Sequence, residues 1–291
     1  MAFFGNPNSN HNKHTEAPDT VTATVQDDVP NRWRIMALSE RHFSKVGALA
    51  AISGLAIYGA SNQILHPQTP PHETEAAFAN YAVEPYWPLY HLGELLGILL
   101  MSAAIIALAW RLRRGVGGVW ATLGGAAMVV CASVYAIFIA VDGVALGIMV
   151  DRWAEARPEQ QELLYETAFA VRQIEGGLFS IQWLMFGIAA GLFAGAFFAS
   201  AERPFHLRWL SVMGWLSVVA SIGALSFGIV QAQTGYSDVS MAFQIGLYVG
   251  VVWVVAVGVF LYRHPEHTDT LRKVSYGEDA EQRHKSSRSR V

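Results

Sequence analysis

The chain has 291 residues, of which 53% are hydrophobic and only 15% are Asp, Glu, Lys or Arg, and its formal net charge is −3. A soluble domain is nearer a quarter charged, so this composition argues against a soluble protein. The small negative charge and the lack of a basic stripe argue against a nucleic-acid partner. The single cysteine leaves no disulfide framework.

The apolar residues gather in six stretches, each of which is long enough to cross a membrane. A helix of about twenty apolar residues, rising about 1.5 Å per residue, spans the roughly 30 Å hydrocarbon core of a bilayer. The stretches cover residues 46–65, 90–110, 119–141, 178–199, 209–230 and 243–262. We therefore expect an all-α fold: a polytopic bundle of six transmembrane helices within residues 31–263.

Both ends of the chain are polar. Residues 1–30 are rich in Asn, Thr and Asp and hold almost no large apolar residues, and residues 264–291 are highly charged. Such segments cannot bury enough apolar surface to fold, so we expect two disordered cytosolic tails.

Basic residues predict the orientation of the helices. Beside the six spans, twelve Lys and Arg fall on the side that holds both termini, and three fall on the opposite side. The three are Arg152, Arg157 and Arg172. Because positive residues stay in the cytoplasm, we expect a multi-pass protein of the cell inner membrane with both termini cytoplasmic.

Two of the outer loops show helical character. Residues 66–89 contain a short helical stretch around 73–81. In residues 142–177, apolar residues recur at helical spacing. We expect this second loop to extend the third and fourth helices beyond the bilayer or to lie along its surface.

Glycines four residues apart recur in the spans, and such pairs let helix backbones approach closely in lipid. We expect them to pack helices within the chain, with a homo-oligomer joined through the same Gly-xxx-Gly faces as the alternative. The pairs and runs are Gly93/Gly97, Gly143/Gly147, Gly187/Gly191/Gly195 and Gly246/Gly250.

Polar residues gather near one level of the predicted bundle, in the outer leaflet or at its interface. Counting residues from the cytoplasmic ends places His91, Glu94, Asp142 and Glu175 at this level. The supporting polar residues are Trp87, Gln182, Gln231 and Gln244. They form either a functional cluster or a structural set of interhelical hydrogen-bonding and solvent-exposed groups.

Glu94 is the least easily explained of these residues, because it lies inside an apolar run. A carboxylate in a low dielectric takes a proton or needs a partner. His91, three residues away on the same helix face, is the expected partner.

Three functions fit this layer. Glu94 and Asp142 would be proton or cation sites in an outer-side polar, acidic pocket that binds a cation or small solute, in a protein of transporter or channel type. Alternatively, His91, Glu94, Asp142 and Glu175 would bind a divalent metal ion in a membrane oxidoreductase acting on a lipid-soluble substrate. The third interpretation is a non-catalytic membrane subunit.

The sequence argues against two cofactors and leaves the catalytic residues unknown. A membrane-spanning bis-His haem needs deeply placed histidines on different spans, and the chain has no such pair. A retinal Schiff base needs a lysine inside the bundle, and Lys45 lies at a cytoplasmic end.

Three runs carry a loose resemblance to a group of bacterial proteins. They are His91-Leu-Gly-Glu-Leu-Leu-Gly, Arg111-Leu-Arg-Arg and Val141-Asp-Gly-Val-Ala-Leu. With them, residues 45–262 resemble the uncharacterised six-helix membrane proteins of bacteria. The resemblance implies a fold and a membrane location but no reaction, and it marks His91, Asp142 and Gly143 as positions of interest.

Overall fold

The computed structural model describes residues 28–65, 74–200, 207–235 and 240–263, with side chains described for 41–65, 74–200, 209–235 and 248–263. The predicted tails lie outside these residues, except that 28–30 begin the first helix. Residues 1–39 and 40–291 form two separate units, and the helical bundle belongs to the second.

The described residues are helical apart from short turns. The elements are α1 (Asp28–Gly59), η1 (Ala60–Leu65), α2 (Thr74–Tyr81), α3 (Trp87–Leu112), α4 (Gly118–Ile139), η2 (Ala140–Leu146), α5 (Gly147–Ala154), α6 (Pro158–Ser200), α7 (Leu207–Thr234) and α8 (Ser240–Arg263). The segments η1 and η2 are wide π-helical turns that continue α1 and α4.

Five helical runs are long and apolar enough to cross a membrane. They are Arg41–Leu65, Trp87–Leu112, Gly118–Ala154, Pro158–Ser200 and Trp209–Thr234. The described apolar part of α8, Tyr248–Arg263, is shorter. The chain is therefore a multi-pass helical membrane protein, and the predicted all-α bundle is confirmed.

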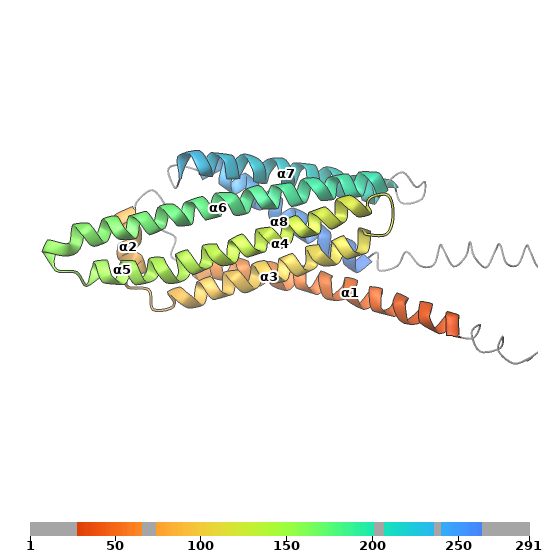
Figure 1. The fold of residues 1–291 in the computed structure, drawn as a ribbon, viewed down its shortest axis with the longest axis horizontal. Coiled ribbons are helices and arrows are strands. Elements are labelled where there is room, and N and C mark those ends of the chain that lie inside the picture. Colours follow the sequence, from red (N-terminus) through yellow and green to blue (C-terminus); the bar gives the residue numbers. More distant parts are fainter. Residues whose placement is uncertain (1–27, 66–73, 201–206, 236–239, 264–291) are drawn as a thin grey trace, which may run out of the picture. The chain divides into compact units, whose positions relative to one another are not determined.

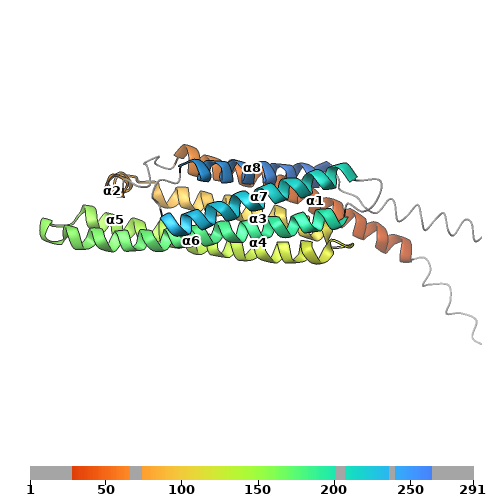
Figure 2. The same cartoon turned by 90° about the horizontal axis from the view of Figure 1, so that it is seen from above.

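The long helices run side by side (Figures 1 and 2), and α6 is the central one. It packs against α4 and α7, while α3 packs against α4 and α8 packs against α7 and α3. The core between them is made of large buried side chains, including Phe193, Phe197, Phe227 and Trp253.

Most of the predicted second outer loop is helical. Residues 142–177 form most of η2, all of α5 and the first half of α6, a helix of 43 residues. At about 1.5 Å per residue, α6 is roughly 65 Å long, about twice the thickness of a hydrocarbon core. The third and fourth helices thus continue into this region, and their position relative to the bilayer stays a prediction.

The extended part has a small core of its own. Buried Phe78 from α2 packs there with Leu146, Val150, Trp153 and Ala168. The helix α2 matches the helical stretch expected around 73–81, and it contacts α5. We call this part, formed by α2, α5 and the start of α6, the α5 end of the bundle.

Several of the predicted glycine faces are filled by side chains of the same chain. A Cβ added to Gly97 would lie 2.7 Å from the Cβ of Tyr58, and one added to Gly187 would lie 2.7 Å from Cγ of Leu225. Gly191 faces Ser221 in the same way. These glycines pack helices within the chain, whereas the homo-oligomer stays a prediction. The side-chain surroundings of position 246 lie outside the described residues.

Candidate functional site

A buried His91–Asp142 pair joins α3 to η2. Nε2 of His91 lies 3.0 Å from Oδ2 of Asp142, and Nδ1 of His91 lies 2.8 Å from the backbone carbonyl of Trp87. The His91 side chain is only 1% exposed, and its ring lies against the Trp87 ring at 4.4 Å between centroids.

These contacts determine which atoms of the pair carry protons. A carbonyl oxygen only accepts, so Nδ1 of His91 carries a hydrogen and donates it to Trp87. Nε2 and Oδ2 of Asp142 then share one further proton, as an imidazolium facing a carboxylate or as a neutral ring facing a carboxylic acid. Either form satisfies both groups.

Glu94 has donors on both carboxylate oxygens. The Nδ2 amide of Asn62 donates to Oε1 at 3.0 Å, and the hydroxyl of Tyr135 donates to Oε2 at 3.1 Å. Glu94 is 3% exposed, so these bonds replace the water that a surface carboxylate would have. The spacing predicted His91 as the charged or hydrogen-bonding partner of Glu94. His91 hydrogen-bonds Asp142 and the carbonyl of Trp87, and it interacts electrostatically with Glu94.

The two π-helical turns bring the unexpected partners into place. Asn62 lies in η1 and Asp142 lies in η2. A π turn shifts the following residues around the helix axis relative to α-helical spacing, and such turns are frequent at functional sites. The turn η1 thus places Asn62 beside Glu94, and η2 places Asp142 beside His91.

A second charged group lies at the α5 end. Arg172 is buried, and its guanidinium hydrogen-bonds the Tyr81 side chain and lies 5.7 Å from the centroid of the Phe78 ring. Burial raises the pKa of Tyr81, Arg172 opposes this rise, and the nearby carboxylates of Asp142 and Glu175 add to it. Tyr81 therefore stays neutral, and its oxygen accepts the hydrogen bond from the buried Arg172.

The structure decides between some interpretations of the polar layer. Asp142 and Glu175 are buried, so they are not the solvent-exposed groups of the structural interpretation. Within the described part of the chain, no three His, Cys, Asp or Glu side chains lie close enough to hold a metal ion. The four-residue metal site predicted from His91, Glu94, Asp142 and Glu175 is therefore not supported.

The supporting residues have separate surroundings. Trp87 stacks on His91, and Gln231 is buried on α7. Gln182 donates from Nε2 to Sγ of Cys131 at 3.8 Å, and the Cys131 thiol donates to the Gln182 backbone carbonyl at 3.4 Å. The side chain of Gln244 lies outside the described residues.

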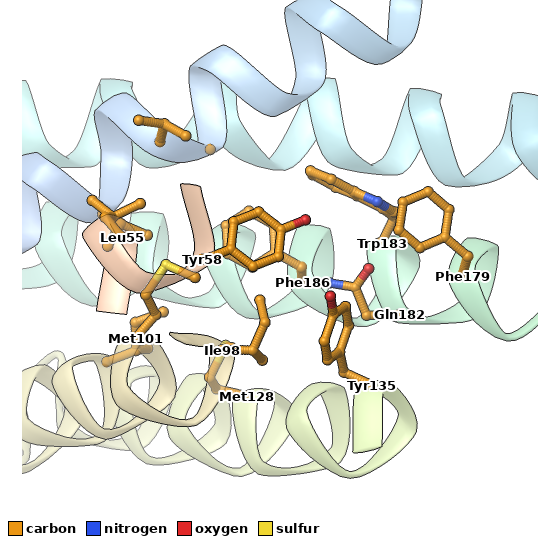
Figure 3. Close-up of a pocket in the computed structure, with 14 residues that line it drawn as sticks. Leu55, Tyr58, Ile98, Met101, Met128, Tyr135, Phe179, Gln182, Trp183 and Phe186 are labelled. Atoms are coloured by element: carbon orange, nitrogen blue, oxygen red, sulfur yellow. The ribbon is translucent and has the colours of Figure 1, made fainter. Parts of the chain in front are cut away.

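A largely apolar cavity, unlike the acidic pocket that the sequence predicts, lies between the helices. It encloses about 590 Å³ of empty space, counting the part that is open to the outside. Figure 3 shows its aromatic and aliphatic walls. The cavity is lined by Leu55, Tyr58, Ile98, Met101, Ile105, Met128, Tyr135, Phe179, Gln182, Trp183, Phe186, Gly250, Val251 and Val254.

Two buried polar atoms belong to side chains that line this cavity. Among the described residues, Oε1 of Gln182 and the indole Nε1 of Trp183 find no hydrogen-bond partner. Leaving such a group unsatisfied costs about 1–3 kcal/mol. Tyr135 connects the cavity to the polar layer, because its ring lines the space and its hydroxyl binds Glu94.

Sequence reasoning missed Asn62, Tyr135, Arg172 and the cavity. Asn62 carried a signal, since it is an amide near the end of an apolar run. Arg172 was counted as a loop charge, and Tyr135 lies in an apolar run without polar neighbours.

Comparisons with protein-family models, with curated proteins and with solved structures find no match for the chain. The resemblance to six-helix bacterial membrane proteins stays a prediction.

Proposed function

We propose that the protein binds a small, uncharged and largely apolar molecule in the cavity between its helices. The cavity is the observation that supports this proposal. Its walls come from five helices, α1, α3, α4, α6 and α8, and they are mostly apolar and aromatic, as is typical of small-molecule sites.

The lining favours an uncharged ligand. Among the described residues, none of those that line the cavity is Asp, Glu, Lys, Arg or His. An ion placed there would lose its hydration without a counter-charge, at a large cost in free energy. Of the small solutes and cations that the sequence suggested, this lining supports a neutral solute.

The carboxylates of the polar layer also argue against a cation as the ligand. Glu94 accepts hydrogen bonds from Asn62 and Tyr135, and Asp142 is engaged by His91. A cation site would need several oxygens converging on one point. We therefore assign Glu94 and Asp142 a supporting role, in which they hold the helices around the cavity. Transport stays a prediction that rests on the buried carboxylates alone.

A thermal-shift experiment tests the proposal with propylbenzene, an uncharged probe small enough for the cavity. A ligand that binds the folded state raises the unfolding temperature. Val251→Phe places a ring in the cavity, whereas Val252→Phe is a matched control, because Val252 is 53% exposed on the outer surface of the bundle.

Propylbenzene should raise the unfolding temperature of the detergent-purified wild type and of Val252→Phe, and should leave Val251→Phe unchanged. An equal shift in all three proteins would show that the probe acts through the detergent or the lipid-facing surface. An equal shift, or no shift in the wild type, contradicts the proposal.

A further inference from the structure

We propose that the molecule bound in the cavity carries a hydroxyl group, as an alcohol or a phenol does, and that Trp183 and Gln182 recognise it. This inference rests on the proposed function, because it assigns the polar end of the same ligand. It depends on two buried polar atoms, of which one is a hydrogen-bond donor and the other is an acceptor.

The donor is the indole N–H of Trp183. The side chain is 7% exposed and lines the cavity, and its Nε1 has no partner among the described residues. Another buried indole in the chain is paired: Nε1 of Trp253 donates to Oγ of Ser217 at 2.8 Å, and that hydroxyl donates to the carbonyl of Met213. A buried indole N–H usually finds such a partner, so the cavity is where an acceptor for Trp183 would lie.

The acceptor is Oε1 of Gln182, and Cys131 determines which end of the amide this is. The thiol hydrogen of Cys131 is donated to the Gln182 backbone carbonyl, so the sulfur offers the amide only a lone pair. The amide end beside the sulfur is therefore the NH₂ group, as the 3.8 Å contact from Nε2 has it. Oε1 is left without a partner in the described residues, on a buried side chain that lines the cavity.

A hydroxyl is the smallest uncharged group that can pair with both an N–H donor and a carbonyl acceptor. It accepts from an N–H and donates its own hydrogen to a carbonyl oxygen. An ether or a ketone only accepts, and a carboxylate would bring a charge into a cavity without a counter-charge. Figure 3 labels Gln182, Tyr58 and Tyr135 as polar side chains in an otherwise largely apolar lining.

The test uses three probes with one carbon skeleton: propylbenzene, para-propylphenol and para-propylanisole, the methyl ether of the phenol. Their affinities are measured on the full-length protein in detergent, with free concentrations corrected for partition into micelles. A hydrogen bond of this kind changes affinity by about three- to tenfold. We expect the wild type to bind the phenol at least about threefold more tightly than the ether.

Trp183→Phe and Gln182→Leu should each reduce this preference, because each removes one of the two partners. Trp215→Phe is the matched control, since Trp215 is exposed on the lipid-facing surface and should keep the full preference. A second readout needs no ligand: Trp253→Phe should lower the unfolding temperature by breaking a made hydrogen bond, and Trp183→Phe should not lose stability in the same way.

The outcomes separate the two proposals. If propylbenzene binds in the cavity but the wild type binds phenol and ether equally, the hydroxyl assignment fails while the proposed function stands. A phenol preference that survives in both Trp183→Phe and Gln182→Leu also overturns the assignment. If none of the three probes binds, both proposals fail.

Discussion

His91 and Asp142 are 51 positions apart in the chain, and their side chains meet at 3.0 Å inside the helical bundle. Because both are buried, the charge or proton that they share is largely shielded from bulk water. The pair fixes η2 against α3 at the level where α4 continues as a π-helical turn.

Breaking this pair should be costly. Removing one partner of a buried pair costs about 3–5 kcal/mol, because the other is left uncompensated. We expect His91→Ala and Asp142→Ala each to lower the free energy of unfolding by about this amount, and the double variant to lose clearly less than the sum. Asp151→Ala, at an exposed position on α5, should change stability by less than about 0.5 kcal/mol. Strictly additive losses, measured by denaturation in detergent, would show that the two side chains are not coupled.

The buried carboxylate of Glu94 should destabilise the protein when it loses the hydrogen bond from Asn62 or Tyr135. Tyr135→Phe and Asn62→Leu each remove one donor from the buried carboxylate, at a cost of about 1–3 kcal/mol. In a Glu94→Leu background the same substitutions should cost much less, since there is no carboxylate left to satisfy. Tyr262→Phe, at an exposed site on α8, serves as the control. Equal costs with and without Glu94 would contradict this assignment.

Two glycines in the same part of the bundle should respond oppositely to alanine. A Cβ at position 143 would lie 2.6 Å from the Cβ of His91, whereas one at position 177 would meet nothing within 4 Å. We expect Gly143→Ala to cost about 1–3 kcal/mol by pushing His91 away from Asp142. Gly177→Ala should be neutral or stabilise the helix by up to about 1 kcal/mol. Thermal unfolding of the two variants compares them directly, and equal effects would place His91 elsewhere.

The orientation inferred from the basic residues gives a labelling prediction. Single cysteines introduced at Thr69 and Ser237 should react with a membrane-impermeant thiol reagent added outside intact cells, and one at Ser200 should not. The native Cys131 is fully buried, so the wild type serves as the unlabelled control. The opposite labelling pattern would reverse the topology.

Much of the fold follows from composition and spacing. The apolar runs fall within α1 and η1, α3, α4 and η2, α6, α7 and α8, because a membrane-spanning helix needs a long apolar segment. The predicted boundaries at the α5 end are less accurate. Arg152, Arg157 and Arg172 lower the hydropathy of residues 142–177, so hydropathy places the span boundaries at 141 and 178. Only the helical spacing of the apolar residues predicts the helical backbone in this region.

The candidate site was only partly predictable. Counting residues along a helix gives the depth of a side chain in the membrane, but it does not tell which neighbouring helix the side chain faces. Depth correctly brought Asp142 to the level of His91, and an i, i+3 spacing suggested that His91 serves Glu94. The true donors of Glu94, Asn62 and Tyr135, are 32 and 41 positions away, and η1 displaces Asn62 from α-helical spacing. The cavity left no signal in the sequence, because an empty space depends on how side chains from five helices meet.

Photoaffinity labelling tests most directly whether the cavity binds a ligand. A para-alkylphenol with a diazirine in its alkyl chain is bound to the purified protein and irradiated, and the labelled residues are mapped by mass spectrometry. We expect label on cavity residues such as Tyr58, Met128 and Trp183, suppressed by excess para-propylphenol and by Val251→Phe. Label confined to lipid-facing residues such as Trp215, or label that excess phenol does not suppress, would contradict ligand binding in the cavity.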